Sequence, residues 1–296
     1  MGNSILLCCI QQLRFRMHPP LTCFMIISLL LCGMAEAQLT RQRAVPDGPV
    51  GNVFWSDTNV GITTVRNLTA GNLNSTVMHT FGLVNGGIER FFGMDDGANT
   101  RLGIDYGISD RVSVGIGRMT FNKTVDVRAK ANLLHQTTTG SMPLELAVKV
   151  SAAANTTPGT GLSLNDRLIY FASLMIARKF DGFSLQLTPM LAHFNRVAVG
   201  NPHQFAGLGM LLNVNLSERL SLGAEYLPVL SERNAGTRDA MGLALNIDTG
   251  GHIFQLFLTT SQWHGEPFIM ANNRDRFFDG DFRFGFNINR VFGTGR

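Results

Sequence analysis

Histidine and serine are the side chains that most often act as catalytic bases and nucleophiles. In this chain they do not occur at the spacing that catalysis requires. Beyond residue 37 the histidines form neither His-x-His nor His-Glu-x-x-His pairs, so a metal site would need ligands from separate segments. No Gly-x-Ser-x-Gly turn is present either. We therefore expect no catalytic residues, no metal and no cofactor, and we do not expect an enzyme. The histidines concerned are His79, His135, His193, His203, His252 and His264.

Three smaller motifs have a functional and a structural interpretation. His79 and His252 stand near Gly-rich turns, where we expect structural hydrogen bonds at strand ends rather than metal ligation. Asp95, Asp96 and Asn99 could hold calcium in a loop, and a plain turn is the alternative.

The third motif is Gly-x-Gly, which occurs at Gly115 and Gly117 and again at Gly207 and Gly209. A phosphate-binding loop would need a helix directly after it, and the sequence predicts strands instead. We expect these glycines to make space inside a barrel.

Charged side chains recur at every second position in stretches that are otherwise small or apolar. Asp126, Arg128 and Lys130, for example, alternate with Val, Ala and Leu in 124–133. A period of two is the side-chain period of a β-strand, so these charges share one face. Charges among Gly and Ser fit the hydrated interior of a membrane barrel, whereas a soluble sandwich would carry more Lys, Glu and Thr. The predicted lumen-facing residues are Arg101, Asp105, Asp126, Arg128, Lys130, Glu145, Lys149 and Glu225.

The elements that position these charges are about twelve predicted strands, with ten or fourteen as alternatives. Short turns and longer loops alternate between them, apart from one reversal in which 122–123 is short and 135–143 is long. An even number of strands, short turns at one end and long loops at the other are typical of a bacterial outer-membrane barrel. We therefore predict an all-β fold, a transmembrane antiparallel up-and-down β-barrel, over 76–296. The strands are expected at 76–83, 100–109, 111–121, 124–134, 144–154, 167–179, 183–194, 205–216, 219–229, 239–248, 252–262 and 281–292. Bulges or earlier strand ends are expected at Pro189 and Pro228.

The last strand, 281–292, places aromatic residues on one face and Arg, Gly and Asn on the other. We expect it to pair with the first strand, which would remove both sheet edges, and to carry the signal for barrel assembly. The residues predicted for this role are Phe282, Phe284, Phe286, Ile288 and Phe292. Such an assembly signal usually ends the chain, whereas here four residues follow Phe292.

The first 37 residues have the pattern of a signal peptide. Arg14 and Arg16 precede an apolar run at 21–32, and Ala35-Glu36-Ala37 is a small-x-small cleavage site, so cleavage is expected before Gln38. Translation from Met17 and a lipoprotein signal at Cys32 are alternatives, although Leu31 stands where the latter needs a small residue. All four cysteines lie in this segment, so a closed sheet or large core must hold the exported chain without disulfides. Residues 38–75 are predicted to be an irregular N-terminal segment, either a plug or a lead-in.

Four segments of the chain are similar to one known family. They are 79–87 (His-Thr-Phe-Gly-Leu-Val-Asn-Gly-Gly), 91–118 (beginning Phe-Phe-Gly-Met-Asp-Asp-Gly), 250–256 (Gly-Gly-His-Ile-Phe-Gln-Leu) and 282–292 (Phe-Arg-Phe-Gly-Phe-Asn-Ile-Asn-Arg-Val-Phe). In these segments the chain resembles a family of bacterial outer-membrane β-barrels classed as a domain of unknown function. The resemblance implies the fold and the membrane location, but no catalytic residues.

Two functions from different classes follow as hypotheses. The first is a porin-like channel for small solutes, whose charged lumen sets selectivity. The second is a closed structural or interaction barrel that acts through its external loops. A barrel-embedded lipid-modifying enzyme is a further alternative. The expected partners are outer-membrane lipid and the barrel-insertion machinery. The basic residues are scattered, so no nucleic acid is expected.

Overall fold

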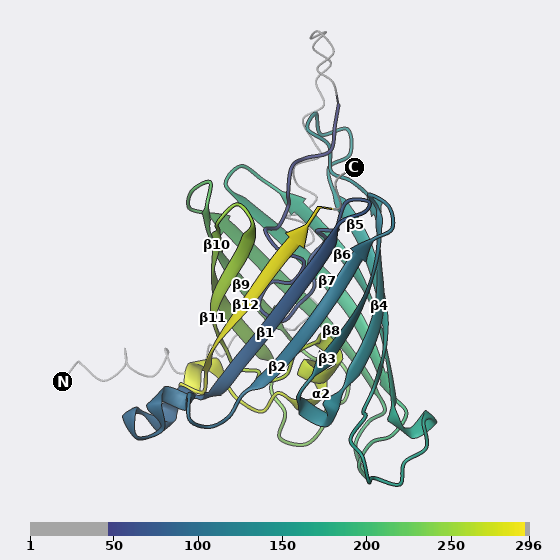
Figure 1. The fold of residues 1–296 in the computed structure, drawn as a ribbon, viewed down its shortest axis with the longest axis vertical. Helices are drawn as coiled ribbons and strands as arrows, with labels where there is room; N and C mark the ends of the chain where they lie inside the picture. The colour runs from purple at the N-terminus through teal and green to yellow at the C-terminus, as the bar shows by residue number, and fades with distance from the viewer. Residues whose placement is uncertain (1–46, 294–296) are drawn as a thin grey trace, which may run out of the picture. The chain divides into compact units, whose positions relative to one another are not determined.

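A computed structural model describes residues 47–293, which form a closed antiparallel barrel of twelve strands (Figure 1). Each strand pairs with its neighbours in sequence, and β1 pairs with β12. The predicted all-β, up-and-down barrel is therefore confirmed. The proposed signal peptide and its cleavage site lie outside the described residues. The strands are β1 (Leu73–Leu83), β2 (Asn99–Gly107), β3 (Val112–Met119), β4 (Val125–Leu134), β5 (Glu145–Ala154), β6 (Leu168–Lys179), β7 (Phe183–Phe194), β8 (Gln204–Asn215), β9 (Leu220–Leu227), β10 (Ala240–Asp248), β11 (His252–Thr259) and β12 (Arg283–Phe292).

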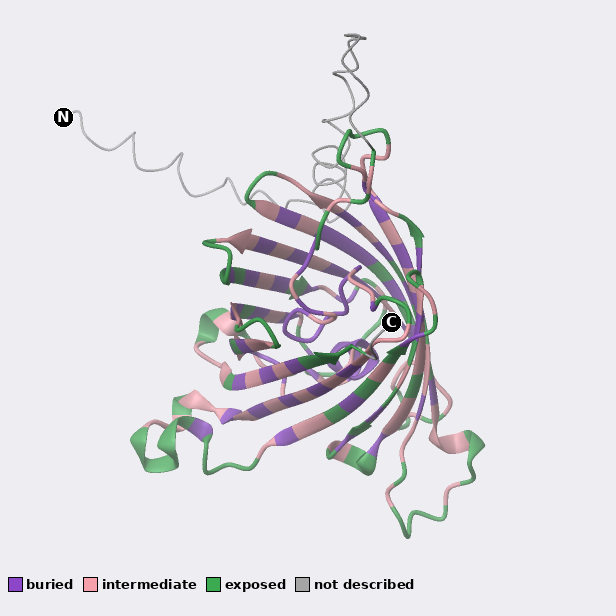
Figure 2. Ribbon diagram, turned by 45° about the horizontal axis from the view of Figure 1, so that its top comes forward, coloured by how far each residue is buried: buried purple, intermediate pink, exposed green. Residues whose placement is uncertain are grey.

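The period of two in the sequence becomes an outward apolar face and an inward, largely polar face. On β2, for example, Leu102 and Ile104 are exposed on the outside, while Arg101 and Asp105 lie inside. Burial alternates in the same way along β1 and β12 (Figure 2). Among residues 47–293, no helix is long and apolar enough to span a membrane.

The connections sort into two ends of the barrel, which we call the turn end and the loop end. The turn end holds the start of β1, the end of β12 and the short connections 108–111, 180–182, 216–219 and 249–251, together with the longer 135–144. The loop end holds 84–98, 155–167, 195–203, 228–239 and 260–282, and also the short 120–124. The reversal expected from the sequence is therefore present. The short connection 120–124 contains the 3-10 turn η4 (Phe121–Lys123), with Asn122 and Lys123 at positive φ.

The two prolines behave differently from one another. Strand β9 ends at Leu227, directly before Pro228, as expected. The expectation for Pro189 is wrong, because it lies inside β7 and pairs with Leu208 without a shift of register. On the β6 side the strand pairing is interrupted around Pro189, because proline has no N–H to donate.

Residues 47–72, which we call the plug, enter the barrel from the turn end and fill much of its interior. They contain no strand, only isolated bridges such as Thr58 with Thr63. Their central residues are surrounded by the strands and almost fully buried: Phe54 is 2% exposed, Ile62 0% and Val65 1% (Figure 2).

A second insertion comes from the loop end. The sequence predicts a plain loop over 263–280, but this loop contains the short helix α2 (Glu266–Asn272), preceded by Gly265 at φ +86°. Helix α2 packs against the inner faces of β6, β7 and β8. Its residues Glu266 to Ala271 are all buried. Seven residues give too short a pattern to show a helical period in the sequence.

Candidate functional site

The eight charged residues predicted for the lumen all lie inside the barrel, where they contact one another, the plug or α2. They fall into two groups. Four of them form ion pairs across the inner wall of β2 to β4. The other four, Lys130, Glu145, Lys149 and Glu225, mainly hold inserted or connecting segments in place.

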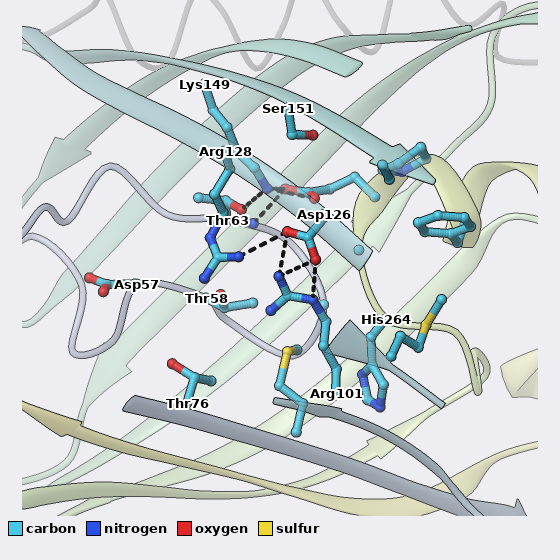
Figure 3. Close-up of a pocket in the computed structure, with 18 of the residues that line it drawn as sticks. Asp57, Thr58, Thr63, Thr76, Arg101, Asp126, Arg128, Lys149, Ser151 and His264 are labelled. Carbon is cyan, nitrogen blue, oxygen red and sulfur yellow. Dashed lines mark hydrogen bonds and ion pairs between the residues drawn. The ribbon is translucent and has the colours of Figure 1, made fainter. Parts of the chain in front are cut away.

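The first group is a charged ladder made of Arg101, Asp105, Asp126 and Arg128. Arg128 donates to both oxygens of Asp105, with Nη2 2.6 Å from Oδ2 and Nε 2.7 Å from Oδ1. Both arginines also point to Asp126, with Arg101 Nη2 at 2.7 Å and Arg128 Nη1 at 2.9 Å from Oδ1 (Figure 3). These charge-assisted bonds are of the strong, partly bidentate kind.

The ladder spans three strands because its middle strand carries glycine. Gly115 of β3 lies between Asp105 and Arg128, and Gly117 lies beside Asp126. A Cβ at Gly115 would stand 2.0 Å from the Asp105 carboxylate, and one at Gly117 would stand 2.1 Å from Arg101 Nη2. The Gly-x-Gly motif therefore makes space for the ladder, as its sequence interpretation proposed.

The second Gly-x-Gly motif, on β8, makes space for the two inserted segments. Gly207 faces Met270 of α2, and Gly209 faces Ile62 of the plug. A Cβ at Gly207 would stand 2.6 Å from Met270 Sδ.

Charged side chains bind the plug through its backbone. Glu225 accepts hydrogen bonds from the N–H groups of Gly61 (2.9 Å) and Ile62 (3.2 Å). Lys130 donates to the carbonyl oxygens of Thr64 and Arg66. The plug is thus held by side chains of the wall, in the way a bound peptide is held.

Glu266 of α2 joins three parts of the barrel interior. It forms an ion pair with Lys149 of β5, with Nζ 2.9 Å from Oε2, and its Oε1 accepts from the plug N–H of Thr63 at 3.0 Å. Burial by itself would raise the pKa of Glu266, but the Lys149 charge and the hydrogen bonds from Thr63 and Lys149 outweigh it and lower this pKa. Wall, plug and α2 are therefore fixed to one another at this carboxylate.

Glu145 has a different task at the turn end. Its carboxylate bonds to His135 Nδ1 at 2.7 Å and accepts from the Gln136 N–H at 2.9 Å and Asn132 Nδ2 at 2.9 Å. It fixes the connection between β4 and β5 and lines none of the cavities described below.

Neutral amides cover the wall formed by β10, β11 and β12, on the other side of β1 from the charged ladder. Gln255 donates to Asn246 at 2.6 Å, and Asn287 donates to Gln255 at 2.6 Å and to the plug carbonyl of Val60 at 3.0 Å. Asn246 in turn donates to Ser221 at 3.0 Å. Between these two walls, β6 and β7 carry an apolar patch in which Phe171, Met175 and Met190 pack with Ile62 of the plug and Met270 of α2. Both the amides and the apolar residues of the wall therefore contact the plug.

Three cavities lie beside the plug, one after another along the barrel. The central one, of about 80 Å³, is lined by the charged ladder, Lys149, Glu266 and His264 (Figure 3). It shares Asp57 with a cavity of about 600 Å³ at the turn end. It shares Thr124 and Phe268 with a cavity of about 280 Å³ at the loop end. Asp57 and Phe268 therefore mark the borders between neighbouring cavities.

The histidines singled out in the sequence make structural contacts. His79 Nδ1 lies 2.8 Å from Thr100 Oγ1, and its ring stacks on Phe286. His252 Nε2 lies 2.7 Å from Arg290 Nη1. His264, which the sequence did not distinguish, is buried and donates from Nε2 to the Asn99 carbonyl at 3.0 Å, and burial lowers its pKa to about 4.

The proposed calcium motif does not assemble. Asp96 pairs with Arg90, while Asn99 is buried and its Oδ1 accepts from Thr120 and from the Phe121 N–H. Within residues 47–293, no group of three or more His, Cys, Asp or Glu side chains is arranged to hold a metal ion.

The closing strand places its aromatic residues outward. Phe284 and Phe292 are exposed, and Phe286 and Ile288 are half-buried on the same face. Phe282 precedes the strand; its carbonyl accepts from the Val84 N–H, and its ring stacks on Phe277.

Two features of the site were not expected from the sequence: the helix in the last loop, and Glu266 as the junction. Glu266 gave no signal because it stands alone in a loop, without the alternation that marked the other charges.

Comparison with known families agrees with this architecture. A family model described as a membrane bound beta barrel domain (DUF5777) matches residues 54–292, and the chain belongs to that family. Comparison with curated proteins gave no match. Among solved structures, the chain is similar to the NanC porin at 9% identity and a TM-score of 0.48, covering 75% of this chain and all of that one. It is also similar to the COG4313 outer membrane channel from Pseudomonas putida F1, at 10% identity and a TM-score of 0.45, covering 77% of this chain and 97% of that one.

Proposed function

We propose that this member of the membrane-bound β-barrel domain family is an outer-membrane channel for small polar solutes, narrowed by its plug and α2. The observation that carries the proposal is the row of three cavities beside the plug, which share lining residues at Asp57 and at Phe268. The charged ladder lines the central cavity of this row. Fixed charges of both signs in a narrow passage would favour small polar solutes over large or apolar ones.

The bacterial outer membrane is the proposed location, with residues 1–37 as the export signal. The arrangement of the two barrel ends supports it, since short turns and both barrel termini at one end are typical of outer-membrane barrels. The exposed apolar faces of the strands would contact lipid. The outward aromatic face of β12 would be read by the barrel-insertion machinery.

A closed interaction barrel is the second candidate, and a specific observation favours it. The ladder charges pair with each other, and two segments occupy the lumen, so a fully sealed interior would also be stable. In that case the loops 84–98, 155–167 and 228–239 at the loop end would carry the function.

Conductance in planar bilayers separates the two candidates. The protein refolded from residues 38–296 should give small, resolvable channel events. The F268A variant should conduct more, because the Phe268 ring separates the central and loop-end cavities and is only 6% exposed. F278A is the matched control, since Phe278 is 88% exposed in the same loop and its variant should conduct like the wild type.

Channel events absent from the wild type and from F268A would favour the closed barrel. Wild-type conductance in F268A would exclude a route past this ring. A heat-dependent shift in gel mobility verifies, for every variant, that the barrel has formed.

A further inference from the structure

The cavity at the turn end, which we call the vestibule, is lined mostly by residues with polar side chains. Its volume of about 600 Å³ is within the range of small-molecule sites. Its walls come from the plug, from β1, β8 and β12, and from the turns 216–219 and 249–251. Trp55, Asp57, Asn74, Asn215 and Asn289 are the lining residues on which the inference rests.

Three of these residues have a buried polar atom without a hydrogen-bond partner among residues 47–293. The atoms are Asp57 Oδ1, Asn74 Oδ1 and Asn289 Nδ2. Asn74 is 1% exposed and Asn289 is 5% exposed. A buried polar group left unsatisfied is costly, so a set of three on one cavity calls for a ligand or water there.

The other atoms of the same side chains are fixed. Asn74 Nδ2 donates to Asp57 Oδ2 at 3.0 Å and to Thr76 Oγ1 at 3.2 Å. Thr76 Oγ1 in turn donates to Asn289 Oδ1 at 3.0 Å. Because these bonds determine the orientation of each group, two acceptors and one donor are left without a partner at the wall of the vestibule. Hydroxyl groups, which both donate and accept, match such a mixed set.

Trp55 adds an apolar surface to the same cavity. Its Nε1 donates to Asn215 Oδ1 at 2.8 Å, so its only hydrogen-bonding group is used and its ring remains for packing. An aromatic ring beside amide and carboxylate groups suits a molecule with apolar C–H groups and several hydroxyls.

The charges of the vestibule argue against an anionic ligand. Its lining has three carboxylates, Asp57, Glu218 and Asp248, against two cations, Arg66 and Lys179. Lys179 Nζ already donates to the carbonyl oxygens of Gly51 and Asn52.

From these observations we infer that the vestibule binds a neutral polyhydroxylated solute, of the size of a mono- or disaccharide. The inference rests on the proposed function in one respect only, namely that such a solute would be the one admitted to the channel. The binding site itself can be tested without any conductance.

The test uses the fluorescence of Trp55 to report binding in the vestibule. The chain has two tryptophans, so the W263F variant leaves Trp55 as the single tryptophan. Maltose is titrated into this variant in an amine-oxide detergent, because detergents with glucoside or maltoside head groups would compete. We expect a saturable change in Trp55 emission, and we expect N74A, made in the W263F background, to weaken the apparent affinity about tenfold, as the loss of one to two hydrogen bonds would.

N132A, in the same background, is the matched control. Asn132 is an inward amide that is 5% exposed and also has an unpartnered Oδ1, but it lies outside the vestibule. It should bind maltose like the parent. N289A provides a second vestibule variant in case N74A does not fold.

The inference is overturned if maltose gives no saturable change, or if N74A and N289A both bind like N132A. It is also overturned if calcium chloride or sodium phosphate changes Trp55 emission and maltose does not, since the vestibule would then be an ion site. Binding of maltose by a protein that does not conduct would reject the proposed channel and leave this site in place. Conductance without maltose binding would reject this binding site and leave the proposed channel in place.

Discussion

The E266Q variant tests how the lumen is kept narrow. Glu266 is 1% exposed, and its carboxylate meets Lys149 of the wall and the Thr63 N–H of the plug. Glutamine keeps the shape and can still accept from Thr63. It leaves the buried ammonium of Lys149 with hydroxyl and amide partners but without a carboxylate.

The expected magnitude follows from the burial of this pair. Removing one partner of a buried ion pair typically costs about 3–5 kcal/mol, because the other charge stays buried and uncompensated. The barrel is closed by twelve strand pairings, none of which involves Glu266, so it should remain folded. The cost can instead be relieved if α2 and the plug leave their positions. Even ~3 kcal/mol would shift the ratio of displaced to inserted states by roughly a hundredfold.

Two measurements report this shift. In planar bilayers, E266Q should spend a much larger fraction of time in a high-conductance state than the wild type does. In hydrogen exchange, the plug amides of Gly61, Ile62 and Thr63 should lose protection while the strands keep theirs. The second readout does not depend on channel function.

Two variants make the result interpretable. E232Q is the matched control, since Glu232 is exposed in the loop between β9 and β10 and should behave like the wild type. The double variant K149M/E266Q removes both charges and should restore most of the closure and protection. The reasoning is refuted if E266Q keeps wild-type protection of the plug, or if the double variant is more open than E266Q.

Three further predictions concern pH, barrel closure and assembly. The pKa of Glu266 is lowered from its ordinary 4.5, so its ion pair is complete above about pH 4.5 and is lost as the pH falls through the pKa of the folded protein. The protection of the plug amides from hydrogen exchange should therefore fall in acid. A plug equally protected at pH 3 and pH 7 would contradict this. G285A should destabilise the closed barrel by about 1–3 kcal/mol, because a Cβ there would stand 2.6 Å from the His79 carbonyl oxygen and 2.3 Å from the Phe257 ring. Urea unfolding measures this loss of stability. G251A is the control, because a Cβ at Gly251 would stand in open space. Deletion of 282–292 should block insertion into the outer membrane rather than merely lower stability, and a deleted protein found folded in that membrane by fractionation would show the prediction to be wrong.

The strands could be located from the sequence because their signal is local. Alternation of apolar with charged or small residues reports two environments on either side of a sheet, and no contact with a distant residue is needed to see it. β7 extends over Phe183–Phe194, the range expected from the pattern. Differences occur at strand ends, as at β1, which begins at Leu73 rather than residue 76, and at Pro189, where pairing with β8 maintains the strand.

The contents of the lumen could not be derived in the same way. Whether Arg128 faces water or Asp105 depends on the register of β2, β3 and β4, which places Gly115 between them. The role of Glu266 depends on Thr63 and Lys149, which are far from it in sequence and next to it only in the folded barrel.

The sequence by itself determined the all-β barrel, its strand boundaries to within a few residues and the charges that face inward, since each follows from a period of two in neighbouring residues. Only the tertiary structure decided which charges pair, where the plug lies, how α2 narrows the lumen and which polar atoms remain unpartnered at the vestibule. These depend on register and barrel closure, which bring together side chains such as Asp57, Asn74 and Asn289 from segments that carry no sequence signal of their proximity.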